Sequence, residues 1–192
     1  MTLDRNVKII AFVGLAGSGK SAAAEYLASK DYPKVYFGGV MYELMKQAGI
    51  EQGEENERKF RVEIRKEIGA DFAAKEIVKQ IHGLIGAGQK RIVADGLYSW
   101  DEYKIMKREF PGELTVVAVV SPKRQRHNRL TTRPERPLTN TEANERDWSE
   151  IEDIQKGGPI AIADFYVIND SDLDNLHAQI DAVLEETGFN KS

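Results

Sequence analysis

The segment Gly14–Ser21 constrains the fold of this chain more than any other feature of the sequence. It has the form G-x-x-x-x-G-K-[ST], which is the pattern of the phosphate-binding P-loop. In such a loop, main-chain N–H groups face the phosphates and the following helix directs its positive dipole end to the same place. Lys20 would supply a cation to the β- and γ-phosphates, and Ser21 would supply a hydroxyl to Mg²⁺. The predicted phosphate-binding residues are Gly14, Leu15, Ala16, Gly17, Ser18, Gly19, Lys20 and Ser21.

The residues on both sides of this motif support the prediction. Residues 7–13 form a nearly continuous apolar run, which is typical of a buried parallel strand. Residues 22–28 are rich in alanine and other good helix formers. The alternative is an ordinary glycine-rich turn between a strand and a helix. The order of strand, glycine turn and helix favours a nucleotide site.

Composition sets the class of protein. A chain of 192 residues with 41% hydrophobic and 30% charged residues is typical of one globular domain. The sequence contains no cysteine, which excludes disulfides, thiol catalysis and thiolate metal sites. A net charge of −4 argues against general nucleic-acid binding. No long apolar segment precedes the first predicted strand, so we expect no signal peptide, no membrane span and a cytoplasmic location.

Short apolar runs alternate with helical patterns along the chain. This alternation indicates an α/β fold with a mostly parallel sheet. The predicted strands are residues 7–13, 35–37, 91–94, 114–120 and 165–168.

Several helix boundaries can also be predicted. Apolar residues at helical spacing cover residues 60–84, with Gly69 expected to kink or divide the segment. Ser99 begins a capping-box pattern, and Ser121-Pro122 opens a further helix with proline in its first turn. Another helix is expected from about Thr141 to a stop at residues 157–159, and a last one over residues 173–184.

Asp95 follows the third predicted strand and is a candidate catalytic residue and metal ligand. A carboxylate at the carboxyl end of a strand lies beside the ligand crevice of an open α/β sheet. There it could bind Mg²⁺ through water or orient an attacking hydroxyl. The alternative is a capping aspartate at the junction of a strand and a turn.

The segment 123–137 is strongly basic, with six Lys or Arg residues and one Glu. Guanidinium groups match the charge that develops on phosphate oxygens during transfer. Arg126 and Arg129 lie three residues apart and can share one helix face. Arg129, Arg133 and Arg136 are therefore predicted to close over the phosphates as a lid. A solvated basic helix or an RNA contact are the alternatives, and the lack of interleaved aromatic residues argues against RNA.

The region after the second predicted strand is a candidate acceptor site. Gly38 and Gly39 would let a helix begin close to a substrate. Arg58, Arg61 and Arg65 follow at helical spacing and could bind an anionic acceptor. Ordinary exposed arginines are an equally good interpretation.

These motifs together resemble the P-loop nucleotide kinases related to adenylate kinase and dephospho-CoA kinase. The likeness covers nearly the whole chain: GLAGSGKS matches the P-loop, RHNRLTTRPER the arginine-rich lid, and IVADGLYSW the segment that places Asp95 on the family aspartate. It implies a single P-loop NTPase kinase domain over residues 1–192, with five parallel strands flanked by helices and a lid at about 121–158. It further implies ATP and Mg²⁺ as cofactors, and Asn169 near the adenine end of the nucleotide.

Three departures from the family pattern concern the acceptor side. Gly39 stands where the family has an aspartate, and Tyr42 and Tyr98 stand where it has arginines. The predicted substrate residues are therefore Tyr42, Arg65 and Tyr98. A tyrosine cannot pair with a phosphate as an arginine does.

The predicted function is an ATP-dependent phosphotransferase that acts on a small nucleotide or nucleotide-like acceptor such as dephospho-CoA. The alternative is an ATP-binding regulatory protein with little turnover. A GTPase is disfavoured because the sequence lacks an Asn-Lys-x-Asp motif. The expected partner is a small molecule that accepts a phosphoryl group. Binding to a membrane or to nucleic acid is not expected, and formation of a homo-oligomer is left open.

Overall fold

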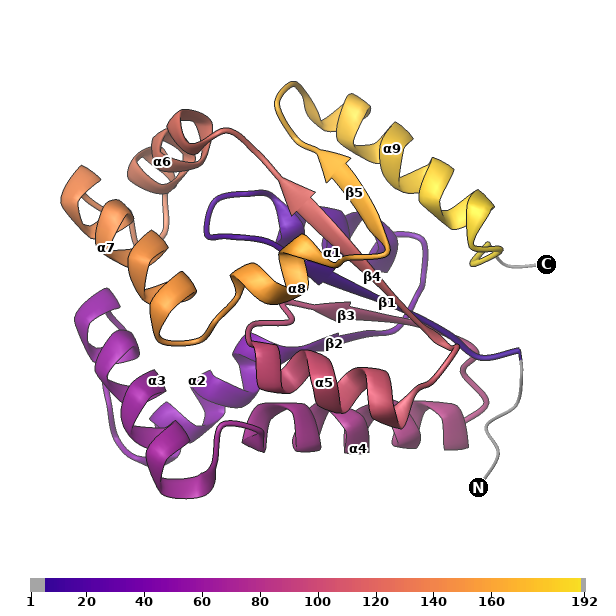
Figure 1. Ribbon diagram of the computed structural model, residues 1–192, viewed down its shortest axis with the longest axis horizontal. Coiled ribbons are helices and arrows are strands. Elements are labelled where there is room, and N and C mark those ends of the chain that lie inside the picture. The colour runs from indigo at the N-terminus through magenta and orange to yellow at the C-terminus, as the bar shows by residue number, and fades with distance from the viewer. Residues whose placement is uncertain (1–5, 191–192) are drawn as a thin grey trace.

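The computed structural model describes residues 6–190, in which five parallel strands form one sheet. The strand order is β2-β3-β1-β4-β5 (Figure 1). The strands are β1 (Lys8–Val13), β2 (Lys34–Tyr36), β3 (Arg91–Asp95), β4 (Leu114–Val120) and β5 (Phe165–Ile168). This arrangement confirms the predicted fold class, and each predicted strand is found within one residue of its expected bounds.

The helices within residues 6–190 connect these strands. They are α1 (Lys20–Ala28), α2 (Phe37–Gln47), α3 (Glu54–Ile68), α4 (Phe72–Gly86), α5 (Trp100–Glu109), α6 (Lys123–Thr132), α7 (Asn140–Glu152), α8 (Gly157–Ala161) and α9 (Leu173–Glu186). Gly69, with φ of 99°, separates α3 from α4 as predicted. The Ser99 capping box is also confirmed, because the Ser99 side chain accepts from the Glu102 N–H.

Two helix predictions were wrong in detail. Pro122 is the N-cap residue of α6, so it lies just before the first turn of this helix and not within it. Residues 157–159 do not stop the preceding helix, because α7 already ends at Glu152 and Gly157 begins α8. Pro159 fits the start of α8 because the N–H groups of a first helical turn have no partner within the helix, so proline loses nothing there.

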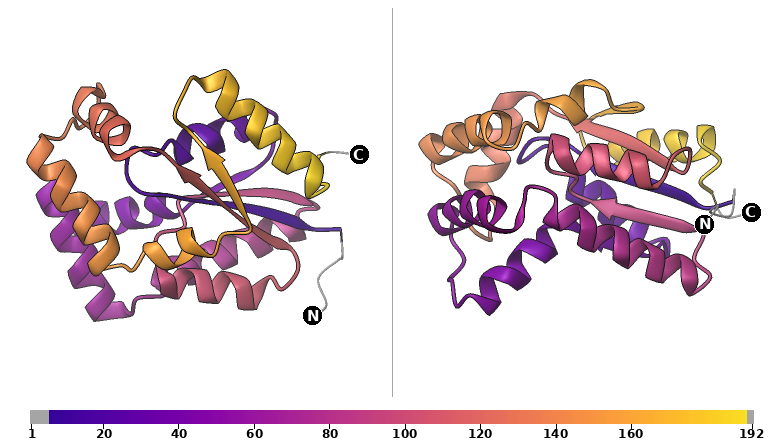
Figure 2. Two further views of the ribbon diagram at one scale, coloured as in Figure 1. Left: turned by 45° about the horizontal axis from the view of Figure 1, so that its top comes forward. Right: turned by 60° about the horizontal axis from the view of Figure 1, so that its bottom comes forward.

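Helices cover both faces of the sheet. Figures 1 and 2 show α1 and α9 on one face and α4 and α5 on the other. The alternation of side chains along a strand produces this division. On β1, Ile10 and Phe12 pack into the cluster with α1 and α9, whereas Ile9 and Val13 pack into the cluster with α4 and α5.

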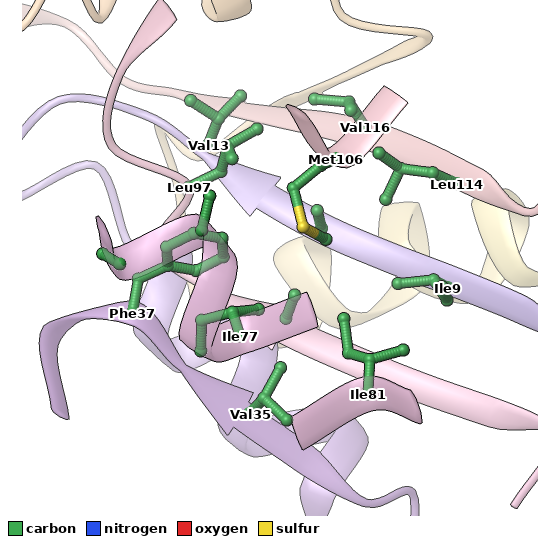
Figure 3. Packing of buried hydrophobic residues seen from close by; sticks show 14 of the residues in the cluster. Ile9, Val13, Val35, Phe37, Ile77, Ile81, Leu97, Met106, Leu114 and Val116 are labelled. Carbon is green, nitrogen blue, oxygen red and sulfur yellow. The ribbon is translucent and has the colours of Figure 1, made fainter. Parts of the chain in front are cut away.

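The larger cluster lies between the sheet and the helices α2, α4 and α5. Phe37, Ile77 and Met106 come from these three helices and belong to the same cluster as the strand residues Ile9 and Val116 (Figure 3). The exposed fraction of each of these side chains is 1% or less. This buried apolar core fixes the positions of the strands, and the carboxyl ends of these strands carry the candidate site.

The carboxyl ends of the parallel strands meet at one edge of the sheet. The segments α2–α3 and α6–α7 extend beyond this edge, on opposite sides of it (Figure 1). Ligands of open α/β sheets bind in the crevice outside the carboxyl ends of the strands. No helix within residues 6–190 has the length and apolar character needed to cross a membrane.

Candidate functional site

The P-loop connects β1 to α1 through backbone that only glycine adopts easily. Gly17 has φ of 77°, and Gly19, the N-cap of α1, has φ of 99°. The space around the loop is also restricted. A Cβ atom on Gly17 would lie 2.6 Å from the Arg126 carbonyl oxygen, and one on Gly19 would lie 2.1 Å from Asn169 Nδ2. The conformation and packing both explain why the motif needs glycine at these positions.

A cavity of about 360 Å³ extends from the P-loop to helices α2 and α3. Lys20 and Ser21 line its end at the P-loop, and Tyr42 and Tyr98 line the end that faces α2. Arg133, the C-cap residue of α6, also lines the cavity. The other residues around it include Ala16, Gly17, Tyr36, Gly53, Glu57, Leu130, Arg136, Pro137, Leu138, Glu142, Arg146 and Glu150. The structure therefore brings predicted donor-side and acceptor-side residues to one cavity.

Ser21 and Asp95 form a pair of oxygen ligands suited to Mg²⁺. The Ser21 hydroxyl lies 3.4 Å from Asp95 Oδ1, and Asp95 is 3% exposed. Burial raises the pKa of the Asp95 carboxyl, while Lys20 and Lys34 act in the opposite direction. Mg²⁺ takes oxygen ligands and usually combines one or two protein groups with water and substrate phosphates. Within residues 6–190, no group of three or more His, Asp or Glu side chains is arranged to hold a metal ion by itself.

The P-loop contains a buried polar side chain whose hydrogen-bonding capacity is unused. The Ser18 hydroxyl is buried and lacks a hydrogen-bond partner among the described residues. An ordered anion in the loop would give this hydroxyl an acceptor, because buried polar atoms in native structures are normally paired. The loop therefore fits a bound phosphate group.

Helices α6 and α7 hold the main chain of the P-loop from outside. The Ala16 N–H donates to Glu150 Oε2 at 3.0 Å, and Arg126 donates to the Ala16 carbonyl oxygen at 3.0 Å. Arg129 donates to the Gly17 carbonyl oxygen at 3.3 Å. The region predicted as a lid thus contacts the loop directly at its base.

Arg126, which was expected to share a helix face with Arg129, is buried against Asp147 of α7. It makes two hydrogen bonds to Asp147, at 2.6 and 2.8 Å, and is 5% exposed. His127 Nε2 lies 2.9 Å from the same carboxylate. Burial raises the pKa of Asp147, but Arg126 and His127 outweigh burial and hold the pKa below its usual value. Arg126 therefore joins α6 to α7 and the P-loop.

Arg129 and Asn169 meet behind the P-loop. Asn169 Nδ2 donates to the Ser18 carbonyl oxygen at 2.8 Å, and Arg129 donates to Asn169 Oδ1 at 3.3 Å. Neither residue is among those that line the 360 Å³ cavity. A broader hollow of about 1160 Å³ lies nearby, between α6 and the start of the β5–α9 loop. Its lining includes Arg129, Asp170 and Ser171 but not Asn169, the residue for which the resemblance implies a position near the adenine.

At the other end of the cavity, Arg136 joins the loop after α6 to α2 and α3. Arg136 donates to the Tyr42 hydroxyl at 2.6 Å and to Glu57 Oε1 at 2.8 Å. Tyr42 in turn donates to Glu57 Oε2 at 3.3 Å. Tyr36 also lines this end, and burial raises its pKa to about 12. A polar, tyrosine-rich surface therefore faces the P-loop.

Arg65 lies beneath this surface and does not line the main cavity. It pairs with Glu102 at 3.2 Å and donates to the Arg61 carbonyl oxygen at 3.1 Å. Together with Tyr98 these residues line a separate cavity of about 30 Å³. Burial raises the pKa of Glu102, and Arg65 opposes this effect.

Sequence reasoning missed the buried charges around the cavity. Glu150 is 2% exposed, and Lys156 is fully buried with its ammonium 2.8 Å from Glu150 Oε1 and 4.5 Å from the centre of the Tyr98 ring. Burial lowers the pKa of Lys156 to about 7, although Glu150 opposes it. Tyr36 and Glu57 were missed as well. Glu57 and Glu150 occur in charged helical stretches that resemble solvated faces, so only the fold distinguishes them.

The fold and the site define a P-loop NTPase domain of the kinase type. A family model described as "AAA domain" matches residues 10–165. The UPF0200 protein of Thermococcus kodakarensis is 33% identical over 181 residues, which cover 93% of this chain and 97% of that protein. The UPF0200 protein of Sulfurisphaera tokodaii is 32% identical over 184 residues, which cover 93% and 97%. The chain therefore belongs to the AAA-domain family that this model describes, and it belongs to the UPF0200 proteins.

Solved structures agree with this fold. Shikimate kinase from Bacteroides thetaiotaomicron aligns with a TM-score of 0.60 and 12% identity, covering 94% of this chain and 98% of that one. Dephospho-CoA kinase from Campylobacter jejuni aligns with a TM-score of 0.53 and 14% identity, covering 95% and 98%. At such identities the comparison establishes the fold, and it confirms the predicted likeness to P-loop kinases.

Proposed function

We propose that this protein is an ATP-dependent phosphotransferase that acts on a small-molecule acceptor. The observation that carries the proposal is one cavity shared by Lys20 and Ser21 at one end and by Tyr42 and Tyr98 at the other. Phosphoryl transfer depends on positioning donor and acceptor in line and on stabilising the charge between them. A single cavity with both sets of residues meets the first requirement.

Several of the predicted residues have a role in this proposal. The main chain of residues 14–21 binds the donor phosphates, and the Lys20 ammonium follows the charge of the transferred group. Ser21 and Asp95 would hold Mg²⁺, which neutralises charge on the phosphates when it is bound. Arg133 lines the cavity at the end of α6, and in this proposal its guanidinium would contact the transferred phosphoryl group.

The acceptor is proposed to be a small nucleotide or nucleotide-like molecule, such as dephospho-CoA. Two observations support this class: the resemblance of the sequence motifs to nucleotide kinases, and the fold shared with a dephospho-CoA kinase. The tyrosines at positions 42 and 98 distinguish this acceptor end from one that binds a phosphate through arginines.

A second candidate is an ATP-binding regulator with little turnover. The observation that favours it is the contact of Arg136 with Tyr42 and Glu57, because these two protein groups occupy a guanidinium that was predicted to contact the phosphates.

One assay separates the two candidates. The protein is mixed with Mg·ATP and a panel of acceptors, and both ADP release and the phosphorylated product are measured. A kinase gives ADP release that depends on the acceptor, with a matching product. A regulator binds ATP and gives neither. Absence of acceptor-dependent ADP with every acceptor would overturn the kinase proposal.

A further inference from the structure

The carboxylates that line the cavity differ in their hydrogen-bond and ionic partners. Glu150 accepts from the Ala16 N–H and pairs with Arg146 and Lys156. Glu142 caps α7 through the Thr139 side chain and main chain. Both of these carboxylates accept from main-chain N–H groups and so hold the backbone, whereas the contacts of Glu57 are with side chains. Glu57 of α3 is the remaining carboxylate of the cavity lining, and it is 4% exposed.

Glu57 is held in a fixed orientation by residues from two other segments. Arg136, in the loop after α6, binds Oε1 at 2.8 Å, and Tyr42 of α2 binds Oε2 at 3.3 Å. Arg136 also binds the Tyr42 hydroxyl, so the three side chains form a closed set of contacts. Carboxylate oxygens have further lone pairs after accepting one hydrogen bond each, so Glu57 can accept from a substrate.

The arginines at this end of the cavity already have carboxylate partners. Arg136 and Arg61 face Glu57 at 2.8 and 3.8 Å, and Arg65 faces Glu102 at 3.2 Å. A phosphate group that used one of these guanidinium groups would have to compete with a buried carboxylate. A phosphate monoester would approach the Glu57 carboxylate, and such like-charge contacts are a means by which sites reject ligands. A neutral hydroxyl group meets no such repulsion and can donate to Glu57.

We propose that Glu57 is a catalytic residue that accepts the proton of an acceptor hydroxyl, and that the acceptor is an alcohol, such as a ribose or polyol hydroxyl, rather than a phosphate monoester. This inference rests on the proposed kinase function. The hydroxyl oxygen forms a bond to the γ-phosphorus of ATP. The bond from this phosphorus to the β–γ bridging oxygen breaks, ADP leaves with that electron pair, and the hydroxyl proton passes to Glu57.

The first test compares two kinds of acceptor with the full-length protein and Mg·ATP. One arm contains alcohols without a phosphate monoester, namely nucleosides, polyols and dephospho-CoA, and the other contains nucleoside monophosphates. Acceptor-dependent ADP in the alcohol arm alone is the expected result. Turnover in the monophosphate arm alone would overturn the inference while leaving the kinase proposal intact. Absence of turnover in both arms would overturn both.

The second test uses the alcohol that is turned over. Glu57→Gln should lower kcat by about 100-fold or more, within the range of general-base catalysis, and leave the Kd for Mg·ATP nearly unchanged. Glu55→Gln is the matched control, because Glu55 lies on the same helix with a side chain that is 73% exposed. A kcat for Glu57→Gln within threefold of wild type would contradict the assignment.

A double variant separates catalysis from structure. If Glu57 served only as the ionic partner of Arg136, Glu57→Gln combined with Arg136→Gln should be no slower than Arg136→Gln alone. A catalytic Glu57 instead requires a further loss of at least tenfold in the double variant. This comparison also covers the case in which Glu57→Gln alone does not fold, since the double variant leaves no uncompensated charge at the Arg136 contact.

Discussion

The residues around the P-loop place positive charge next to buried carboxylates. Lys20 acts on both Asp95 and Glu150, since its charge lowers the pKa of each carboxyl. These groups lie on different sides of the loop, one at the end of β3 and one on α7. In a protein interior such charges interact more strongly than in water. The Lys20 ammonium therefore already has a defined electrostatic environment before a phosphate binds.

Replacement of Lys20 tests whether its positive charge serves phosphoryl transfer. Lys20→Ala should lower turnover by about 100-fold or more, because a preorganised positive charge near the transferred group is lost. The fold should persist, as circular dichroism can verify. Lys79→Ala is the control, since the Lys79 side chain is 80% exposed on α4. Unchanged turnover in Lys20→Ala would show that this lysine does not serve the transfer.

Lys156 gives a prediction about stability and pH. Its pKa falls from 10.5 in the unfolded chain to about 7 in the folded protein. Between these values the unfolded chain binds more protons, so this lysine makes the free energy of unfolding increase as pH rises from about 7 to 9. Lys156→Met should remove that increase, measured by urea unfolding at both pH values. Lys79→Met should keep it, and an equal increase in both variants would contradict the buried state of Lys156.

At the scale of elements, two pairs of helices enclose the cavity. The pair α6–α7 is fastened to the P-loop through Arg126 and Glu150. The pair α2–α3 meets the loop after α6 through Tyr42 and Glu57, and both contacts involve Arg136. Arg136 has φ of 51°, an uncommon conformation for a residue other than glycine. The surrounding contacts thus hold this residue in place at the junction of the two helix pairs.

Loss of the Arg136 side chain should separate acceptor chemistry from ATP binding. Arg136→Ala removes the hydrogen bonds to Tyr42 and Glu57, so we expect kcat to fall by about tenfold or more while the Kd for Mg·ATP changes less than threefold. Steady-state kinetics and calorimetry provide the two values. Arg108→Ala, at an exposed position near the end of α5, is the control. Equal losses in kcat and ATP affinity would instead indicate simple charge attraction.

At the scale of the whole molecule, binding of nucleotide should raise thermal stability. A ligand at about 100 times its Kd stabilises the folded state by about 2.7 kcal/mol. For a domain of this size that corresponds to a rise in Tm of about 5 to 10 °C. Scanning calorimetry with Mg·ATP, and with adenosine as the control without phosphate, measures it. An equal shift with adenosine would show that the P-loop does not provide the affinity.

The sequence predicts the sheet and the P-loop because both depend on local patterns. The apolar run of β1, the glycines of the loop and the capping box at Ser99 are each readable within a few neighbouring residues. The acceptor end depends on contacts between distant residues. Glu57 and Arg136 are 79 positions apart, and Ala16 and Glu150 are 134 apart. Neither pair has a local signature, so the partners of the predicted lid arginines could be found only from the fold.

The main chain of Ala16 has a consequence for how substrates enter. Its N–H is bound by α7 and its carbonyl oxygen by α6, so these two helices cannot move away without distorting the P-loop. We therefore expect the opening for a second substrate to lie on the opposite side of the cavity, where α2 and α3 meet α7 and the loop after α6 through the ion pairs of Arg58 with Glu145 and of Arg136 with Glu57. Opening and closing would then be a movement of α2 and α3 relative to α6 and α7.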